Sequence, residues 1–537
     1  MALPTEPTYV WPVGAETSVM NTSMPTVTGT TLSATSCGEI TTHLATLKAL
    51  DGNLSHKLKI TSSLTCNQTL VMPLRTGTNP NGTGWIIFET TDAANLPAEG
   101  TRVIPATHAG FMPKVNGPST NNHAMYFART AHHFRFIGIE FGMATGAVNN
   151  GPIVATGTAA SDYITNTADY PHHIVYDRVY VHGQPTVTAR RCIGIEANNV
   201  GIVDSHVSDC HEVGSDSQAI AGWNFQGPLK VVNNYLEGAG ENFITGGSPY
   251  VVAGGIPSDI EIRRNYFFKP LSWRVGDPTY AGIAWTVKNS FELKNAQRVI
   301  VEGNVMKHCW FASQRGYHVL FTPRHETDVP SPVVNDITFR YNRLISSSGG
   351  FSIIGRDSEG IYFNTGLPDE VNRIWIHNNL LEDVSSTNWA ADGRLFMFLY
   401  GPHDLRIDHN TGFAGGGASA TAAIGEDPAN YIGACPTCDA PYINDNVVVQ
   451  DNILSRGTSG VFGSAKAEGN SSINYYSTGG TFTKNDIIGA TLANYPANNY
   501  NTALGSILFK NQSGLFCTDC GLQVGSPLYN QATDGGD

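Results

Sequence analysis

The 537-residue sequence predicts an all-β fold, a parallel β-helix of about ten or more coils. Three observations support this fold class: a unit that recurs along most of the chain, an alternation of period two inside it, and an asparagine at one fixed place. The unit is clearest between Ser290 and Met306. There Val299 and Val301 alternate with residues that can face away, Asn304 follows three places later, and apolar Met306 comes next.

The same frame recurs roughly every thirty to forty residues, a range that marks a stacked-repeat architecture. Copies that contain the asparagine are Leu229, Val231, Asn234; Ile260, Ile262, Asn265; Ile337, Phe339, Asn342; Ile374, Ile376, Asn379; Leu405, Ile407, Asn410; and Val447, Val449, Asn452. Earlier copies that keep the apolar spacing without the asparagine are Phe134, Phe136; Ile174, Tyr176; and Val200, Ile202, with Ser205 at the asparagine place.

The period inside each copy distinguishes strands from helices. Alternation every second residue is a strand signal, which excludes the helical solenoids. An asparagine between two short strands indicates a turn, because asparagine tolerates left-handed backbone and its amide can bond to the same amide one layer away. We therefore expect each turn of the chain to be one coil, paired with the coils above and below, and the asparagines to form an internal ladder.

A further strand is expected just before each marked pair, so that three sheets run along the coils. These segments are Phe243 to Thr245, Phe291 to Lys294, Val319 to Thr322, Phe351 to Gly355 and Leu395 to Tyr400. The outward positions of this third sheet are where chemistry is most plausible.

The two ends of the chain have a different pattern. Residues 1–34 are rich in Thr, Ser and Pro and predict an extended lead or linker. Residues 35–537 are predicted to form one β-helix domain, with an N-terminal cap and first coils over 35–130, regular coils over 131–455, and last coils with a C-terminal cap over 456–537. Between Glu39 and Leu50, apolar residues at helical spacing predict a short amphipathic helix that covers the first strand edges.

Composition limits the partners. The formal net charge is −13, which argues against nucleic acid, because phosphate binding needs concentrated Lys and Arg. No apolar run approaches twenty residues, so no membrane span is expected. No signal peptide is visible at Met1, and a mature exported chain would also begin without one. We expect a monomer that acts outside the cell or in the periplasm.

Nine cysteines leave at least one without a partner inside the chain. Cys37 with Cys66, and Cys192 with Cys210, bracket single segments and suit disulfides of an exported protein. Two CxxC pairs, Cys435 with Cys438 and Cys517 with Cys520, fit a structural disulfide, with zinc binding or free thiols as alternatives.

The run Phe291-Glu-Leu-Lys-Asn-Ala-Gln-Arg-Val-Ile-Val-Glu-Gly-Asn304 resembles the strand, turn, strand passage of pectate lyase-like right-handed β-helix proteins, and so does Asn335-Asp-Ile-Thr-Phe-Arg-Tyr-Asn342. The whole chain also resembles bacterial secreted β-helix repeat proteins. The first resemblance implies a right-handed β-helix and cleavage of an acidic, uronate-containing polysaccharide by β-elimination. That reaction needs a group that neutralises the uronate carboxylate, a base, and a donor for the leaving oxygen.

On the third sheet, Lys294, Arg324 and Arg356 are predicted to form a cationic strip, because coils stack about 4.8 Å apart. The resemblance implies that Arg324 or Lys294 is the base, and Lys294 is the chemically easier one. His318 is a further acid or base candidate. Additional candidates are Asn242, Thr322, Trp273 and Trp310 for binding sugar, and Glu241 and Glu292, with Asn242, for binding Ca²⁺.

Other interpretations stay open. The cations can be solvated strand ends, and Glu241 and Glu292 can be ion pairs with a neighbouring coil. The histidine pairs at 132–133 and 172–173 are more typical of surface turns than of a metal site. The alternative function is a non-catalytic glycan-binding or surface structural protein. A glycoside hydrolase is the third choice, because the chain lacks the adjacent Asp-Asp and the Gly-His-Gly of polygalacturonase-like enzymes.

Overall fold

The computed structural model describes residues 20–158, 164–247, 252–324, 332–356, 371–425 and 443–535. Within this part the chain forms two compact units. The N-terminal unit contains the described residues up to 245 and residues 252–286, and the C-terminal unit contains residues 246–247 and those from 287 onward. Each unit is a right-handed parallel β-helix with three sheets, named here A, B and C; the repeat predicts the parallel β-helix, and the resemblance implies its hand.

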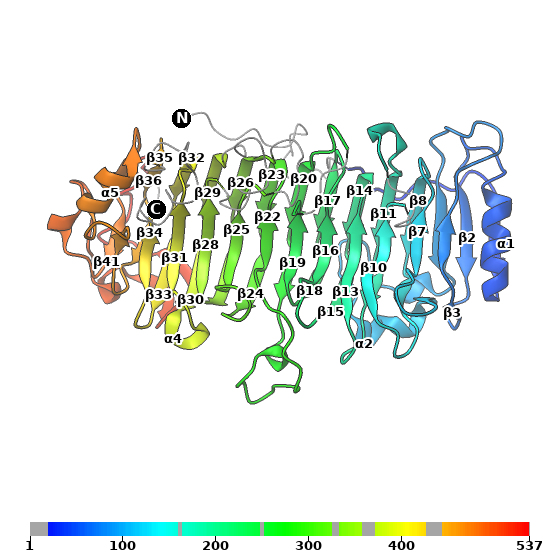
Figure 1. Cartoon of the computed structure of the whole chain (residues 1–537), viewed down its shortest axis with the longest axis horizontal. Helices are drawn as coiled ribbons and strands as arrows, with labels where there is room; N and C mark the ends of the chain where they lie inside the picture. The colour runs from blue at the N-terminus through cyan, green and yellow to red at the C-terminus, as the bar shows by residue number, and fades with distance from the viewer. Residues whose placement is uncertain are drawn as a thin grey trace. The chain divides into compact units, whose positions relative to one another are not determined.

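In the N-terminal unit each sheet takes one strand from each successive coil (Figure 1). Sheet A contains β1 (Thr31–Ala34), β2 (His56–Ile60), β5 (Ile86–Thr90), β8 (His132–Ile137), β11 (His172–Asp177), β14 (Asn198–Val203), β17 (Leu229–Val232) and β20 (Ser258–Arg263). Sheet B contains β3 (Thr65–Asn67), β6 (Lys114–Gly117), β9 (Glu140–Met143), β12 (Tyr180–His182), β15 (His206–Cys210), β18 (Tyr235–Gly238) and β21 (Tyr266–Phe268). Sheet C contains β4 (Leu70–Met72), β7 (Met125–Phe127), β10 (Asn149–Thr156), β13 (Ala189–Ile195), β16 (Gln218–Gly222) and β19 (Glu241–Thr245).

The C-terminal unit repeats this order. Sheet A contains β23 (Ala296–Glu302), β26 (Val334–Arg340), β29 (Asn372–His377), β32 (His403–Asp408), β35 (Asn444–Asp445), β36 (Val448–Gln450), β39 (Ser477–Thr478) and β40 (Thr481–Thr483). Sheet B contains β24 (Val305–Cys309), β27 (Arg343–Ser347), β30 (Leu380–Ser385), β33 (Thr411–Gly415), β37 (Ile453–Ser455) and β41 (Asp486–Ile488). Sheet C contains β22 (Phe291–Leu293), β25 (Tyr317–Phe321), β28 (Gly349–Ile354), β31 (Arg394–Leu399), β34 (Ala420–Ala423) and β38 (Val461–Phe462).

The interior of each unit is filled by the alternate side chains of the strands and by stacked asparagines. Val299, Ile337 and Ile374 are fully buried and occupy the same register position on three neighbouring strands. In the turn between sheets A and B, the backbone N–H and the side-chain Nδ2 of Asn304 both donate to Oδ1 of Asn342, each at 2.9 Å. Asn342 donates in the same way to Asn379. Further members of the two series are Asn410, Asn452, Asn485 and Asn499 in the C-terminal unit, and Ser205, Asn234 and Asn265 in the N-terminal unit.

Helices are short and few in the described residues. The longest, α1 (Cys37–Leu47), forms where the apolar spacing predicts it, and it buries Ile40, Leu44 and Leu47. Ser36 and Glu39 form a capping box at its start, and the helix packs against β1 and β2. The other helical segments are α2 (Pro105–His108), α4 (Ser386–Trp389), α5 (Asn470–Tyr476), η1 (Ala93–Asn95), η2 (Ala109–Phe111), η3 (Thr167–Asp169), η4 (Leu271–Trp273), η6 (Leu492–Asn494) and η7 (Leu504–Ser506). No helix in the described residues is long and apolar enough to span a membrane.

Three disulfides form among the described residues. Cys37–Cys66 and Cys192–Cys210 confirm the pairings suggested by sequence position. Cys517–Cys520 confirms the disulfide interpretation of the second CxxC pair, while Cys435 and Cys438 lie outside the described residues. Cys309 is buried outside any of these disulfides, and its thiol donates to the carbonyls of Lys288 and Tyr317 at 3.1 and 3.3 Å.

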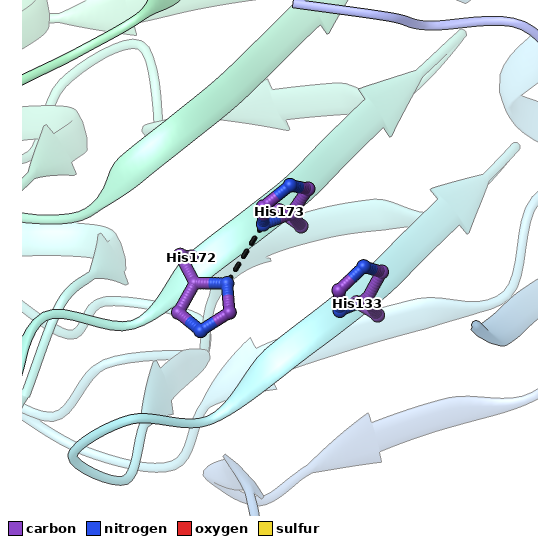
Figure 2. Close-up of side chains that lie close together, drawn as sticks. All are labelled: His133, His172 and His173. Atoms are coloured by element: carbon purple, nitrogen blue, oxygen red, sulfur yellow. Dashed lines mark hydrogen bonds between the residues drawn. The ribbon is translucent and has the colours of Figure 1, made fainter. Parts of the chain in front are cut away.

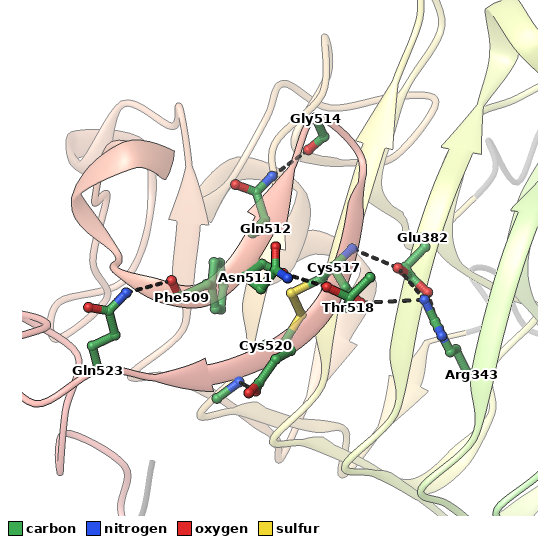
Figure 3. Close-up of a disulfide and its surroundings, with 12 residues drawn as sticks. Arg343, Glu382, Phe509, Asn511, Gln512, Gly514, Cys517, Thr518, Cys520 and Gln523 are labelled. Atoms are coloured by element: carbon green, nitrogen blue, oxygen red, sulfur yellow. Dashed lines mark hydrogen bonds and ion pairs between the residues drawn. A yellow bond between two sulfur atoms is a disulfide. The ribbon is translucent and has the colours of Figure 1, made fainter.

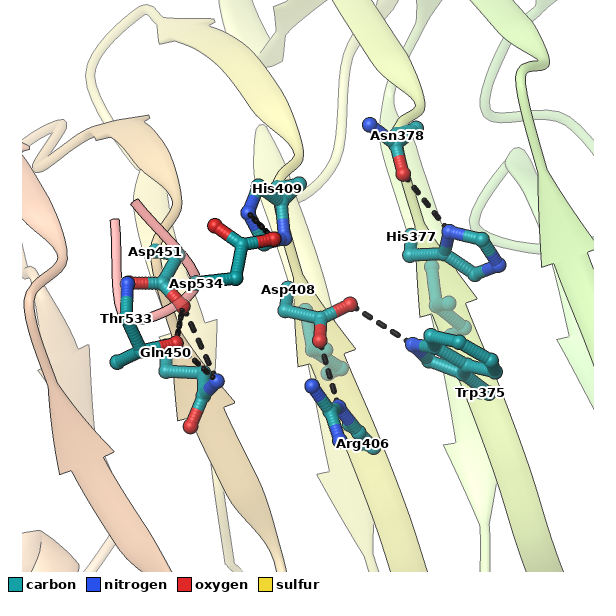
Figure 4. A network of polar contacts seen from close by, with 12 residues as sticks. Trp375, His377, Asn378, Arg406, Asp408, His409, Gln450, Asp451, Thr533 and Asp534 are labelled. Carbon is teal, nitrogen blue, oxygen red and sulfur yellow. Dashed lines mark hydrogen bonds and ion pairs between the residues drawn. The ribbon is translucent and has the colours of Figure 1, made fainter. Parts of the chain in front are cut away.

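The C-terminal residues cover sheets of their own unit. Strands β42 (Phe509–Ser513) and β43 (Phe516–Leu522) form an antiparallel hairpin, and the Cys517 N–H donates to Glu382 Oε1 of β30 at 2.7 Å (Figure 3). Farther on, Thr533 contacts Asp451, and Asp534 lies 3.4 Å from His409 (Figure 4). The hairpin and the final segment therefore cover the outer surface of the last coils.

Candidate functional site

The candidate site lies on the outer face of sheet C in the C-terminal unit. Strands β22, β25, β28 and β31 pair in parallel, so that Glu292, Leu320, Ser352 and Met397 form one outward row. Their sequence neighbours, such as Phe291 and Phe351, fill the interior instead. The period-two alternation thus sets which side chains reach the surface, as the sequence predicts for this sheet.

A cavity of about 310 Å³ opens over this row. This volume is in the range of ligand pockets. The lining combines three cations with amide, hydroxyl and apolar groups, and it consists of Asn289, Glu292, Lys294, Gln314, Arg315, Tyr317, Leu320, Thr322, Arg324, Ser352, Ile354 and Met397.

Lys294 lies at the centre of the polar contacts. Its Nζ is 3.2 Å from Glu292 Oε1, and its side chain is only 9% exposed. Asn289 Nδ2 bridges Glu292 Oε2 at 3.2 Å and Gln314 Oε1 at 3.0 Å. Gly247 packs directly on the aliphatic stem of the lysine, where a Cβ would lie 2.7 Å from Cδ. The ammonium is therefore held in one place, with a carboxylate as counter-charge.

A second ion pair borders the cavity. Arg315 Nη1 is 2.6 Å from Asp392 Oδ1, and the Tyr317 hydroxyl donates to Asp392 Oδ2 at 3.1 Å. Burial, and then the negative charge of Asp392, raises the pKa of Tyr317, so the phenol stays protonated. Gly349 on β28 leaves room for the Tyr317 ring, because a Cβ there would lie 2.4 Å from ring carbon. The Arg315 side chain remains 61% exposed and can turn toward a bound anion.

Thr322 and Arg324 follow the end of β25 in the cavity wall. The Thr322 N–H donates to the Leu293 carbonyl, and the Arg324 N–H donates to the Lys294 carbonyl, both at 3.0 Å. These bonds fix the Arg324 backbone beside Lys294. The Thr322 Oγ1 is buried and has no hydrogen-bond partner among the described residues, so it can take up a bond to a ligand.

The structure brings together Lys294, Arg324, Thr322 and Glu292 from the predicted set. Arg356, half-buried, follows β28 but does not line this cavity. His318 is fully buried, with Nδ1 2.9 Å from the Ser290 hydroxyl and Nε2 3.1 Å from the Ile345 carbonyl oxygen. Both of its ring nitrogens are therefore engaged away from the cavity.

The remaining predicted residues have other surroundings. Asn242 in the N-terminal unit is fully buried and donates to the carbonyls of Leu236 and Phe268. Trp273 of the same unit and Trp310 of the C-terminal unit are 5% and 4% exposed, which leaves little ring surface for a sugar to stack on. Trp273 lies edge-on to His211 of the same unit, with ring centroids 5.4 Å apart.

The structure gives each predicted calcium ligand a donor partner. Glu241, in the N-terminal unit, accepts from Gln218 Nε2 at 2.7 Å. Both oxygens of Glu292 face N–H donors, from Lys294 and Asn289. Ca²⁺ requires six to eight oxygen ligands, and Glu292 is the only carboxylate in the described lining of the cavity. The residues around Glu292 as arranged do not fit a calcium ion.

Arg315, Tyr317, Asn289, Gln314, Ser352 and Met397 were not predicted from the sequence. Ser352 and Met397 follow from the register once the strands are aligned, because they lie in the same row as Glu292. Arg315 and Gln314 precede β25 in a turn, and no periodic signal marks turn residues. Their position depends on loop conformation, which the repeat does not encode.

A smaller cavity, of about 160 Å³, lies on sheet C of the N-terminal unit. Glu196 and Trp223 line it, and Arg191 lies 5.0 Å from the Trp223 ring. Burial raises the pKa of Glu196 to about 7. A larger cavity, of about 460 Å³, in the C-terminal unit is lined by interior residues such as Phe396, Ile407 and Leu454, and its described lining has no charged group. The cavity of about 310 Å³ over Glu292, named here the cationic cavity, is the best candidate. Of these three cavities, it alone combines several cations with hydrogen-bonding amide and hydroxyl groups.

Comparisons with known proteins give a distant likeness. No family model and no curated protein matches the chain. Among solved structures, it is similar to a mannuronic acid specific polysaccharide family 6 lyase from human gut microbiota, with 12% identity, a TM-score of 0.44, and coverage of 89% of this chain and 92% of the other. It is also similar to the A-module of the Azotobacter vinelandii mannuronan C-5 epimerase AlgE6, with 11% identity, a TM-score of 0.32, and coverage of 84% and 88%.

Proposed function

We propose that the cavity on sheet C of the C-terminal unit binds an acidic polysaccharide and that the protein cleaves it by β-elimination. The observation that carries the proposal is the convergence of Lys294, Arg315 and Arg324 on one cavity whose described lining has Glu292 as its only carboxylate. Guanidinium groups match the planar carboxylate of a uronate. A protein of this kind acts outside the cell or in the periplasm, as the disulfides also suggest.

The proposed roles follow from the positions. Arg324 and Arg315 neutralise the substrate carboxylate, which acidifies the adjacent carbon-bound proton. Lys294 takes that proton in its neutral form, the electron pair forms a carbon–carbon double bond, and the bond to the leaving oxygen breaks. Lys294 then gives the proton to the leaving oxygen, so that protons balance without a further group.

The test is a lyase assay on pectate, alginate and glycosaminoglycans, followed by the absorbance of the unsaturated product at about 232 nm. We expect Lys294→Ala and Arg324→Ala each to lower kcat/KM by about 100-fold or more. Arg340→Ala is the matched control, because Arg340 forms an ion pair with Glu302 on sheet A of the same unit. Its kcat/KM should stay within about twofold of wild type. Absence of product on every uronate polymer would reject cleavage.

Calcium enters the same assay as a variable. If Lys294 and Arg324 carry the reaction without a metal ion, we expect EDTA to leave the rate of cleavage unchanged. A rate that falls with EDTA and returns with Ca²⁺ would instead assign part of the carboxylate neutralisation to the ion.

A second candidate is glycan binding without cleavage. The ion pair between Lys294 and Glu292 favours it, because it holds the ammonium as a fixed cationic contact in the cavity, and such a contact suits binding of an anionic sugar. Saturable binding of a uronate polymer that stays intact after long incubation would support this candidate. A glycoside hydrolase has less support, since inverting or retaining hydrolysis needs two carboxyl groups across the bond that breaks.

A further inference from the structure

A separate cluster of histidines lies in the N-terminal unit, at the start of two neighbouring strands of sheet A. His132 and His133 begin β8, and His172 and His173 begin β11. The strands pair in parallel with His132 opposite His172, so the two histidine pairs fall in register on consecutive coils. His132 and His133 are only 4% and 7% exposed. The sequence favours surface turns for these histidines, but His132 and His133 are largely buried.

The four imidazole rings form a closely packed arrangement. His133 and His173 have left-handed backbone, with φ of 58° and 57°. Within each pair the two Nδ1 atoms are 2.7 Å apart. Between coils the rings stack almost parallel, at 5.0 Å for His132 on His172 and 4.4 Å for His133 on His173. Figure 2 shows His172 and His173 meeting at their nitrogens, with His133 on the adjacent strand.

The hydrogen bonds identify where one lone pair lies. His132 Nε2 is 3.0 Å from the Pro80 carbonyl oxygen, which can only accept, so this nitrogen carries the proton. His132 Nδ1 then presents its lone pair toward His133. At 2.7 Å His132 Nδ1 accepts from His133 Nδ1, so the lone pair of His133 lies on Nε2. An imidazole N–H directed at a backbone carbonyl, as in His132, is a usual orienting contact around metal-ligating histidines.

In the C-terminal unit, the equivalent left-handed positions at the start of sheet A strands carry side chains of opposite charge. Arg373 binds Asp336 of the neighbouring coil through two bonds, at 2.6 and 2.9 Å, and both residues have left-handed backbone. His133 and His173 have no carboxylate in this role. Among the described residues, no protein hydrogen bond reaches Nε2 of His133, His172 or His173. The histidine cluster therefore lacks the complementary charge that completes the arginine–aspartate pair.

We propose that His133, His172 and His173 bind a divalent transition-metal cation, with Zn²⁺ as the best fit and His132 as an adjacent fourth nitrogen. One ring nitrogen from each of the three lies within 4.8 Å of the others. Tetrahedral Zn²⁺ with Zn–N of about 2.0–2.1 Å needs nitrogens about 3.4 Å apart. Ring rotations that open the short contacts by about 0.7 Å and close the long ones by up to about 1.4 Å complete the site.

The surroundings select the type of ion and limit its affinity. Imidazole nitrogens suit Zn²⁺, Cu²⁺ and Ni²⁺, whereas Ca²⁺ and Mg²⁺ require oxygen ligands. The buried guanidinium of Arg75 contributes, after burial, to lowering the pKa of His133, so its positive charge also opposes a cation. A bound ion would join two consecutive coils and stabilise the N-terminal unit.

The experiment is a titration of the metal-free full chain with Co²⁺ at pH 7.5, read by the visible absorption of tetrahedral cobalt, followed by displacement with Zn²⁺. We expect one equivalent to bind in the wild type, and binding to weaken at least tenfold in His133→Gln and in His172→Gln. His206→Gln is the matched control, because His206 is also a stacked histidine of this unit, half-buried on Tyr235 of sheet B. Its binding should equal that of the wild type.

A second measurement, made on the wild type, tests the proposal even if the variants do not fold. X-ray absorption of the zinc-loaded wild type should show three or four imidazole ligands. No stoichiometric binding, fewer than two imidazole ligands, or unchanged binding in both folded variants would overturn the proposal. None of these readouts depends on polysaccharide cleavage, so this proposal and the proposed function stand or fall separately.

Discussion

At the scale of single residues, the buried asparagines occupy the positions that require the most hydrogen bonds from one side chain. Most of them accept two hydrogen bonds at Oδ1 from the asparagine of the preceding coil and donate from Nδ2 to backbone carbonyls. Asn379, for example, accepts from the backbone and side chain of Asn342 and donates to the carbonyls of Phe339 and His377. No other neutral side chain of this size supplies both functions.

Removing one such amide should be costly. We expect Asn379→Ala to lower the free energy of unfolding by about 2–4 kcal/mol, because several buried groups lose their partners at once. Urea unfolding of the purified variant measures this. The control is Asn378→Gly, since Asn378 lies outside this series and its φ of 54° suits glycine. A loss at Asn379 no larger than at Asn378 would contradict the argument.

The sequence predicts these residues and the fold well, for a physical reason. Stacked coils repeat the same environment, so Asn304, Asn342 and Asn379 appear at one place in a recurring pattern. Lys294 and Arg324 could be placed together because both depend on strand register. Arg315 could not, because its turn has no repeated environment, and the burial of Trp310 depends on loops with no period.

At the scale of elements, the strands of the N-terminal unit carry half-buried histidines whose pKa values lie below the ordinary value. Burial, and then neighbouring histidines, lowers the pKa of His172 to about 4. Burial, and then Arg102, lowers the pKa of His206 to about 3. Below pH 6.5 the unfolded chain takes up protons that the folded unit does not, so stability is complete above this pH and is lost as the pH falls toward 3 to 4. Sheets A and B of this unit are thus sensitive to acid.

A single substitution tests this sensitivity. His206→Phe keeps the stacking on Tyr235, 4.2 Å away, and removes the titrating group. We expect its unfolding free energy to fall less steeply than that of wild type between pH 7 and 5, by up to about 1.4 kcal/mol per pH unit. Urea unfolding at several pH values gives the slopes. Equal slopes for the wild type and His206→Phe would be inconsistent with a neutral His206 in the folded unit.

At the scale of the whole molecule, the ends of the β-helices need covalent and packed covers. Cys37–Cys66 ties α1 to β3 across 29 positions of sequence. Cys517–Cys520 spans three positions in β43, whose hairpin packs on sheet B of the C-terminal unit. In the chain-entropy description, the longer loop gains far more stability from its disulfide.

The two disulfides can be compared directly. Replacing Cys37 and Cys66 with serine should lower the unfolding free energy by about 3–4 kcal/mol, and the same change at Cys517 and Cys520 by about 1–2 kcal/mol. Chemical denaturation of both double variants provides the comparison. An equal loss would show that loop length does not set the effect.

The cationic cavity is built from strand residues and from turn residues. Its floor consists of strand residues, such as Ser352 and Met397, whose direction is dictated by every neighbouring coil, while part of its wall comes from the turn that holds Gln314 and Arg315. Mutation can lengthen or recharge that turn without disturbing the floor. If the cavity binds a polymer as proposed, changes in this turn would alter which polymer it takes while the strands keep their geometry.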